Sequence, residues 1–217
     1  MKDKFLAQVR RIVLFGCGGH ARSIVNVLRE DGEDREILLV DKNANYKETI
    51  MGCRVVYEYD LKENDGYVIA IGDNGQRRKL FQLLVGNNIG HCLSVISMHA
   101  YVGIESQIGQ GTFVAANAYI GPMSEIGDNT IVNTGSVVEH EVIIGSNTHI
   151  APNATVCGRS RIGNNVFCGA GCTIIDKINV CDNVIIGAGA VVKDDIVEEG
   201  TYVGVPARKI ERRAYAL

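Results

Sequence analysis

A run of Ile and Val at every sixth position occupies the second half of the chain and constrains its fold more than any other feature. From Ile96 to Val192, sixteen of the seventeen residues in this register are Ile or Val, and the remaining one is Cys168. The position four residues later is Ala, Ser, Thr or Cys in twelve of seventeen repeats, and the position directly after is Gly in eight. A period of six predicts short flat strands joined by tight turns, whose coils stack and bury their faces against one another. A β-sandwich with coincidental spacing is the alternative.

This repeat resembles that of the hexapeptide-repeat acyltransferases. The resemblance implies a left-handed parallel β-helix with three hexapeptides in each coil. We therefore expect an all-β domain over residues 94–217, including a C-terminal tail.

The first part of the chain follows different rules, because apolar runs alternate with segments of helical spacing. These predict strands and helices in turn. Strands are expected at 11–15, 37–40, 54–57 and 67–71, and helices at 20–30 and 76–84. The βαβ pattern predicts a small parallel sheet, and thus a Rossmann-like domain over residues 1–93. The expected fold class is α/β plus all-β.

A glycine-rich turn joins the first strand to the first helix. Gly16-Cys17-Gly18-Gly19-His20-Ala21 fits the pattern G-x-G-x-x-A, and Asp41 ends the next strand about twenty residues later. Such glycines let the backbone approach a ligand phosphate at a helix N-terminus, where free N–H groups favour anions. Glycines that merely form a tight turn are the alternative. Taken alone, this pattern indicates dinucleotide binding. Fewer than a hundred residues precede the repeats, however, which leaves no separate catalytic domain for hydride transfer with NAD. A nucleotide-sugar is therefore the natural ligand, with Asp41 accepting hydrogen bonds from its base or ribose.

The whole chain resembles the PglD-type UDP-amino-sugar N-acetyltransferases and the related NeuD-type sialate O-acetyltransferases. The matching motifs are GCGGHA at 16–21, DKN at 41–43, AIGDN at 70–74, VEHE at 138–141 and GVPAR at 204–208. The resemblance implies an acetyl-CoA-dependent N-acetyltransferase that acts on a UDP-linked 4-amino-4,6-dideoxy sugar for surface glycans. It implies that the sugar nucleotide contacts Gly16, Gly18, Gly19, His20, Asp41, Lys42, Asn43 and Gly72. Lys42 stands where the family has a second acidic residue, so the identity of the nucleotide stays open.

His140 and Glu141 are the candidate catalytic pair. His140 occupies the third place of its hexapeptide, at an outward position near a turn, and a carboxylate beside an imidazole can hold one tautomer and stabilise the imidazolium. The resemblance implies that His140 is the general base and that Glu141 increases its basicity. It also implies that Asn133 lies near the acceptor, where it could orient the amine or the histidine. An asparagine in a turn is the alternative for Asn133.

His149 lies nine residues, or half a coil, from His140. The two side chains are therefore not expected to meet at one point within a single chain, and a site shared between subunits resolves this. The resemblance implies that His149 contacts acetyl-CoA and that the adjacent chain completes the pocket. We expect a homotrimer.

Two small-residue triplets, 169–171 and 187–189, both read Gly-Ala-Gly and lie eighteen residues apart. With three hexapeptides in each coil they stack directly and leave a strip without large side chains. A pantetheine arm needs such a strip, because its amides reach backbone groups only where side chains do not intervene. The resemblance implies that Ala170 and Ala188 contact acetyl-CoA. Small residues required by the turns alone are the alternative.

Composition excludes several other classes of protein. The net charge is −3, with 22% charged residues spread along the chain, so we expect no binding to nucleic acid. Seven cysteines show no CxxC pair, and no cluster has the spacing of metal ligands, so we expect no metal and a reducing compartment. Cys168 and Cys172 occupy core positions of the repeat. No signal peptide or window of twenty apolar residues is present, so we expect a cytoplasmic protein without membrane insertion.

Three other functions remain in competition. The first is O-acetylation of sialic or a related nonulosonic acid, and the second is N-acetylation of a GDP-linked amino sugar. The third is a β-helix scaffold that binds a nucleotide without catalysis.

Overall fold

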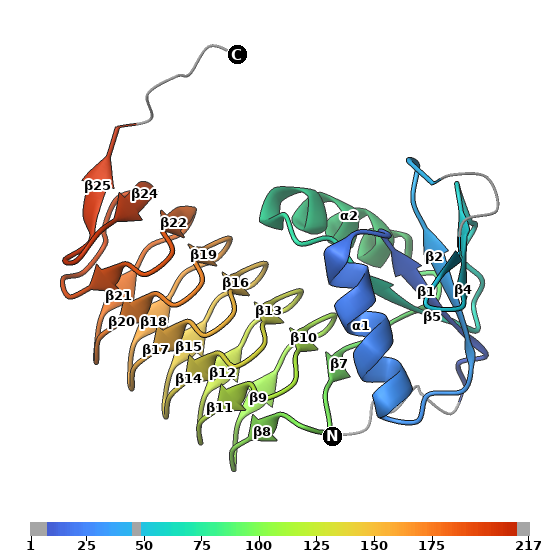
Figure 1. The fold of residues 1–217 in the computed structure, drawn as a ribbon, viewed down its shortest axis with the longest axis horizontal. Coiled ribbons are helices and arrows are strands. Elements are labelled where there is room, and N and C mark those ends of the chain that lie inside the picture. The colour runs from blue at the N-terminus through green and yellow to red at the C-terminus, as the bar shows by residue number, and fades with distance from the viewer. Residues whose placement is uncertain (1–7, 45–48, 212–217) are drawn as a thin grey trace.

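A computed structural model describes residues 8–44 and 49–211 of the chain (Figure 1). It contains a small α/β region that lies beside the first coils of a β-helix, while the later coils extend away from it (Figure 1). The predicted fold class is confirmed. The outer limits of the two expected domains, residues 1 and 217, lie outside the described residues.

The α/β region is built on a six-stranded sheet with the order β3-β4-β2-β1-β5-β6. Neighbouring strands run parallel, except for the antiparallel pair of β3 and β4. The elements are β1 (Arg11–Phe15), α1 (Gly19–Glu30), β2 (Glu36–Val40), β3 (Thr49–Ile50), β4 (Cys53–Val56), β5 (Asp65–Ile69), α2 (Asn74–Asn87) and β6 (His91–Cys92). The predicted alternation of strands and helices is therefore confirmed.

Most of the predicted elements begin or end one to three residues away from the observed bounds, and side-chain hydrogen bonds explain two of these differences. β5 begins at Asp65, two residues before the expected Tyr67, because the buried Asp65 carboxylate accepts two hydrogen bonds. α2 begins at Asn74 because the Asp73 side chain caps it by accepting a hydrogen bond of 2.8 Å from the Gln76 N–H. The two-residue strands β3 and β6 have too little alternation to be recognised in the sequence.

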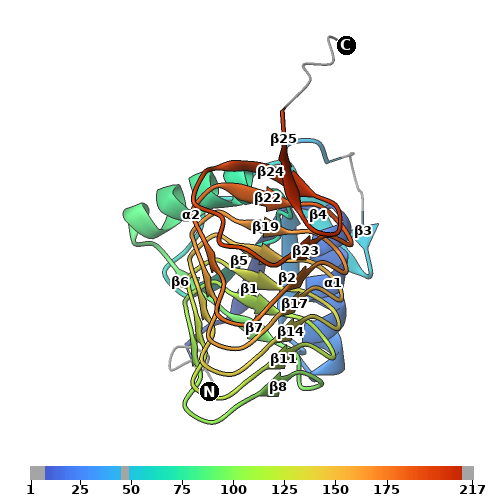
Figure 2. The ribbon, with the colours of Figure 1, turned by 90° about the vertical axis from the view of Figure 1, so that its left-hand side faces the viewer.

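The β-helix has three strands in each coil, and strands eighteen residues apart pair in parallel. Val132, for example, lies opposite both Val114 and Ile150. The three sheets, here called the first, second and third faces, have the orders β25-β24-β22-β19-β16-β13-β10-β7, β23-β20-β17-β14-β11-β8 and β21-β18-β15-β12-β9. Figure 2 shows the coils superposed along the stack.

The strands of the β-helix have the following bounds. They are β7 (Val95–Ile96), β8 (Tyr101–Val102), β9 (Gln107–Ile108), β10 (Phe113–Val114), β11 (Tyr119–Ile120), β12 (Glu125–Ile126), β13 (Ile131–Val132), β14 (Val137–Val138), β15 (Ile143–Ile144), β16 (His149–Ile150), β17 (Thr155–Val156), β18 (Arg161–Ile162), β19 (Phe167–Cys168), β20 (Thr173–Ile174), β21 (Asn179–Val180), β22 (Val184–Ile186), β23 (Val191–Val192), β24 (Gly200–Val203) and β25 (Arg208–Ile210).

The interior of the β-helix is filled by the residues of the six-residue register. Val114, Val132, Val138, Ile150 and Cys168 are fully buried in one continuous core. The repeat was therefore interpreted correctly, because each β-branched residue packs only against its neighbours in the coils above and below.

The α/β region covers the outer side of the first face. Phe113 and Ile131 point outward from that face, yet they are only 2% and 1% exposed, because they pack in one core with Ile24 of α1. Separating the α/β region from the β-helix would therefore expose apolar surface. The three turns of each coil are named here by the face they follow: residues 133–136, 139–142 and 145–148 form the first, second and third corners of one coil.

Candidate functional site

The glycine turn before α1 is shaped to approach a ligand with its backbone. Gly16 has a φ of +115°, and a Cβ at this position would lie 2.7 Å from the carbonyl oxygen of Ala70, so only glycine fits. Gly18 is the N-cap residue of α1 and makes no side-chain cap, while a Cβ on Gly18 or Gly19 would meet nothing within 4 Å. Uncapped N–H groups beside open space are suited to bind a phosphate.

Asp41 braces this turn from the end of β2. Its carboxylate accepts hydrogen bonds from the backbone N–H groups of Cys17 at 3.0 Å and Asn43 at 2.8 Å. Burial alone would raise the pKa of Asp41, but these hydrogen bonds outweigh it and hold the pKa below its ordinary value. The sequence analysis predicts that Asp41 contacts a nucleotide. In the structure, the ionised side chain of Asp41 also holds the glycine turn beside the exposed Lys42-Asn43 segment.

His140 and Glu141 lie together at the second corner. Nδ1 of His140 is 3.1 Å from Oε2 of Glu141, and the same oxygen accepts a hydrogen bond of 2.9 Å from Nε of Arg159, one coil further along. The hydrogen bond with His140 and the charge of Arg159 lower the pKa of Glu141. An ionised Glu141 accepts a hydrogen bond from the Nδ1–H of His140, which leaves Nε2 as the basic nitrogen of the ring.

Gly158 gives the His140 ring its place on the next coil. A Cβ at Gly158 would lie 2.6 Å from Cε1 and 2.7 Å from Nε2 of His140. The imidazole therefore lies over a residue that must have no side chain. Arg159 and Gly158 were both missed in the sequence, although each stands eighteen residues after a member of the predicted catalytic pair.

Replacing Gly158 with alanine is expected to displace the imidazole and lower kcat by roughly ten- to a hundredfold, because small misplacements of reacting groups cost that much. The fold should be retained, since the contact is with the end of a side chain that is 42% exposed. Gly86→Ala is the control, because its Cβ would meet nothing within 4 Å. Kinetics and thermal unfolding measure both effects, and a wild-type kcat in Gly158→Ala would contradict the expectation.

The second corner differs from the other two in its left-handed residues. At the first and third corners these are all Asn or Gly, namely Gly111, Asn117, Asn129, Gly135, Asn147, Asn153, Asn165, Gly171, Asn183 and Gly189. At the second corner they are Glu105, Met123, Glu141, Arg159 and Lys177. A left-handed backbone costs an ordinary side chain about 1 kcal/mol, a cost that Gly avoids and Asn reduces. The second corner thus keeps large side chains where the backbone disfavours them, and this irregularity is visible in the sequence.

His149 belongs to a separate, buried cluster on the first face. It is 8% exposed, its Nε2 accepts a hydrogen bond of 3.1 Å from Nδ2 of Asn133, and its ring meets the edge of Phe167. The ring of His20, from the glycine turn, packs against Phe113 at 5.1 Å between centroids. The first face therefore brings together three predicted site residues that lie far apart in the sequence.

Both imidazoles of this cluster are held neutral. Burial, then electrostatic interaction with His149 and with Arg77, lower the pKa of His20 to about 3. Burial, then the charge of Arg77, lower the pKa of His149 to about 4, although the carbonyl of Gly72 opposes this. Within the described part of the chain, the buried Nε2 of His20 and Nδ1 of His149 have no hydrogen-bond partner of good geometry. Two such atoms are suited to a polar ligand group or a bound water.

Acid is expected to destabilise the fold through these two histidines. Their unfolded pKa is near 6.5 and their folded values are lower, so below pH 6.5 the unfolded chain binds more protons. The free energy of unfolding should therefore fall between pH 6.5 and 4, by on the order of 1 kcal/mol for each unit of pKa difference. Urea unfolding across this range tests it. The fall should be smaller in His149→Gln, and an equal fall in that variant would contradict the assignment.

The predicted site residues thus form two groups on one chain. His140 and Glu141 lie at the second corner, whereas Asn133 and His149 lie at and beside the first corner, at the other end of β14. Asn133 bonds to His149 rather than to His140. This agrees with the expectation that His140 and His149 do not meet within one chain.

The two Gly-Ala-Gly triplets stack at the first corner, as predicted. The Gly189 N–H donates to the Ala170 carbonyl at 2.9 Å, and Ala170 and Ala188 are both exposed. A Cβ on Gly171 or Gly189 would meet nothing within 4 Å. The strip is therefore smooth and open to a narrow ligand.

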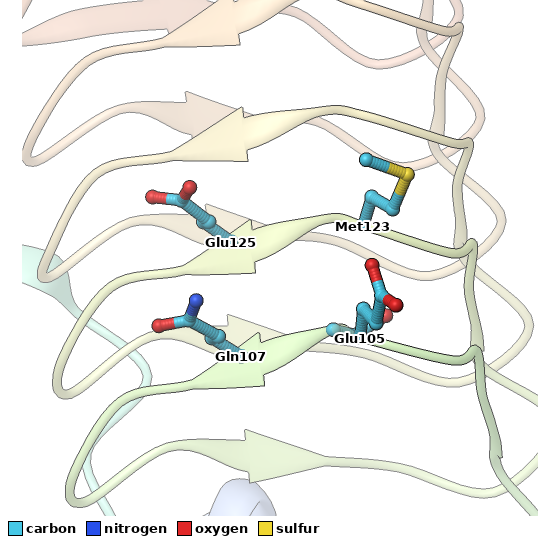
Figure 3. A pocket seen from close by; sticks show the side chains of 5 residues that line it. Glu105, Gln107, Met123 and Glu125 are labelled. Atoms are coloured by element: carbon cyan, nitrogen blue, oxygen red, sulfur yellow. The ribbon is translucent and has the colours of Figure 1, made fainter.

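Other features of the described residues contribute no site. A hollow of about 510 Å³ opens on coils before that of His140, and Figure 3 shows side chains of two successive coils around it. It contains none of the predicted site residues and is lined by Glu105, Ser106, Gln107, Met123 and Glu125.

Among residues 8–44 and 49–211, no group of His, Cys, Asp and Glu is arranged to hold a metal ion. Cys168 and Cys172 are fully buried, as expected for core residues. Neither helix of the described chain is long and apolar enough to cross a membrane.

Comparison with known proteins places both parts of the chain. Residues 11–84 match the family model of the PglD N-terminal domain, and residues 123–158 match that of the bacterial transferase hexapeptide (six repeats). No curated protein sequence matches the chain significantly.

Solved structures extend the similarity over nearly the whole length. The acetyltransferase domain of PglB from Neisseria gonorrhoeae, also solved with acetyl coenzyme A, is 28% identical with a TM-score of 0.87, over 93% of this chain and 100% of that one. A variant of perosamine N-acetyltransferase from Caulobacter crescentus, solved with CoA and GDP-perosamine, is 30% identical with a TM-score of 0.84, over 92% of this chain and 96% of that one. WeeI from Acinetobacter baumannii shares the fold at 24% identity, with a TM-score of 0.82 over 92% and 99% of the two chains.

Proposed function

Because this chain belongs to the PglD/NeuD-type family of left-handed β-helix acetyltransferases, which use acetyl-CoA, we propose that it acetylates the amino group of a nucleotide-linked sugar. The observation that carries the proposal is the exposed pair of His140 and Glu141 at the second corner. Glu141 contacts Nδ1 of the imidazole and leaves Nε2 available to accept a proton. The test is CoA release from acetyl-CoA, measured with nucleotide-linked amino sugars as acceptors.

The reaction is a direct transfer. The amine attacks the carbonyl carbon of the thioester, a C–N bond forms, and the C–S bond breaks as CoA leaves as a thiolate. Nε2 of His140 takes the proton from the amine and returns it to the thiolate, while Glu141 stabilises the imidazolium in between. Arg159 holds Glu141 in place for this role. A backbone N–H stabilises the oxyanion of the tetrahedral intermediate.

The two substrates occupy different parts of the molecule. The uncapped N-terminus of α1 and the glycine turn bind the phosphates of the sugar nucleotide, with Asp41 at the base or ribose. His20 and Gly72 extend this site toward the first face. The pantetheine arm of acetyl-CoA follows the smooth strip of Ala170 and Ala188 and leads toward His149.

The nucleotide is proposed to be UDP, as the family resemblance implies. GDP is the second candidate, because a GDP-perosamine complex is among the similar structures and Lys42 replaces an acidic residue beside Asp41. A thermal-shift screen of UDP-, GDP- and CMP-sugars separates these, since a ligand that binds only the native state raises the unfolding temperature.

A homotrimer would bring the two groups of site residues together, with His140 of one chain facing His149 of the next. If each site is shared in this way, His140→Ala and His149→Ala chains are both inactive alone but regain activity when mixed. Random mixing leaves about a quarter of the sites of a threefold assembly with both histidines. Co-expression with two affinity tags and light scattering provide the measurement. An active monomer, or mixtures no better than their parents, would contradict a shared site.

A further inference from the structure

Arg77 is a buried cation that the proposed reaction does not use. It lies in the first turn of α2 and is 1% exposed, and in the described chain no carboxylate forms a salt bridge with it. Burial lowers the pKa of Arg77 to about 10, so the guanidinium is still charged at neutral pH. The carboxylate of Asp73 interacts with this charge without forming a salt bridge. A buried charge that lacks a salt bridge is costly unless its donors are used, so the hydrogen bonds of Arg77 indicate its role.

One edge of the guanidinium holds the loop that follows β5. Nη1 donates to the carbonyls of Ile71 at 3.2 Å and Gly72 at 3.0 Å, and Nη2 donates to Oδ1 of Asn74 at 2.7 Å. Gly72 is one of the residues expected to contact the sugar nucleotide. This edge therefore sets the position of the nucleotide site.

The remaining donors hold two successive coils of the β-helix at the third corner. Nε donates to the carbonyl of Asn129 at 3.0 Å, and Nη2 donates to the carbonyls of Asn147 at 3.0 Å and Thr148 at 3.3 Å. Thr148 directly precedes His149. One rigid, planar group thus contacts both the loop of Gly72 and the segment that ends at His149.

We propose that Arg77 is a positioning residue for acetyl transfer, which sets the distance between the sugar-nucleotide loop at Gly72 and the coil that carries His149. This inference rests on the proposed function for the roles of Gly72 and His149. A flexible ammonium could not replace the guanidinium, because five carbonyls and an amide oxygen on three segments require donors in a fixed fork.

The charge of Arg77 has a second effect on the same site. It lowers the pKa of both His20 and His149, in addition to the effect of burial. A neutral His149 can accept the hydrogen bond from Asn133 at Nε2, whereas a protonated ring has no acceptor. Arg77 therefore supports both the position of His149 and its hydrogen bond from Asn133.

The test compares Arg77→Lys and Arg77→Gln with the same changes at Arg78, its exposed neighbour on α2. In Arg77→Lys we expect a folded protein whose kcat/KM for the sugar nucleotide falls roughly ten- to a hundredfold. In Arg77→Gln, the NMR titration of His149 in the free protein should move toward 6.5, whereas in Arg77→Lys it should stay low. The Arg78 variants should match the wild type in both measurements.

Two results would overturn the inference. One is a folded Arg77→Lys with wild-type kcat/KM, and the other is an Arg77→Gln in which the His149 titration is unmoved. If Arg77→Gln does not fold, the lysine variant still decides. Failure of the proposed function is separate, because the wild type would then show no turnover of sugar nucleotides while the His149 titration remained measurable.

Discussion

Replacing His140 with alanine is expected to lower kcat by about 10² to 10⁴, the contribution that positioned general bases commonly make. The fold and the affinity for acetyl-CoA should be retained, because the side chain is 42% exposed and its hydrogen bond is to Glu141 at the same surface. Steady-state kinetics and calorimetric titration with CoA measure the two properties separately.

Two further variants sharpen this result. Glu141→Ala should reduce kcat less than His140→Ala, because it removes the orientation of the base but not the base itself. His99→Ala, at an exposed histidine on the first corner of an earlier coil, should leave the kinetics unchanged. A near wild-type kcat in His140→Ala, under conditions where proton removal limits the rate, would require another base.

Removing the nucleotide from the acceptor is expected to lower kcat/KM by at least about 10², because binding energy at the glycine turn positions an amine that reacts elsewhere. The matching change in the protein is Asp41→Ala. It should raise the KM for the sugar nucleotide and leave the KM for acetyl-CoA little changed, whereas His140→Ala lowers kcat. The two variants should thus show separable phenotypes.

Three acceptors decide between the proposed function and its main rival. These are a UDP-linked 4-amino sugar, the same amino sugar without its nucleotide, and free sialic acid. Equal or better efficiency on free sialic acid would contradict the nucleotide-linked acceptor and favour an O-acetyltransferase. Equal efficiency on the free amino sugar would remove the glycine turn and Asp41 from substrate binding.

The β-helix was predictable from the sequence because each coil repeats one physical requirement. A residue that points inward must be apolar and β-branched, and Val132 and Ile150 satisfy this eighteen residues apart. The second corner carries the opposite signal, although the prediction of Glu141 rested on its place beside His140 and on the family resemblance, and Arg159 was missed. Its left-handed positions hold Glu141 and Arg159, where the other corners have Asn or Gly. A departure from a strong local rule indicates a residue kept for another purpose.

The buried cluster could not be predicted in the same way. His149 occupies an outward position of its repeat, and it is buried only because the α/β region lies over the first face. Arg77 lies among charged residues on α2 and looks like part of a solvated surface, yet it is fully buried. Both environments arise from contacts between segments remote in sequence, which no local periodicity records.

The stack of coils separates the position of the α/β region from the length of the strip at Ala170 and Ala188. Side chains of α2 donate hydrogen bonds to the carbonyls of Asn129, Thr148 and Val166, which lie in three consecutive coils. These bonds hold the α/β region in position on the β-helix. An extra eighteen-residue unit inserted after Ile174 would leave these contacts of α2 and the surroundings of His140 unchanged. It would lengthen the strip at Ala188 by about 5 Å, the spacing of paired strands. Insertions whose length is not a multiple of eighteen would move the later side chains to other positions around the coil. If acetyl-CoA follows the strip as proposed, duplication of a whole coil would therefore extend the surface for the acyl carrier and leave the proposed acceptor site as it is.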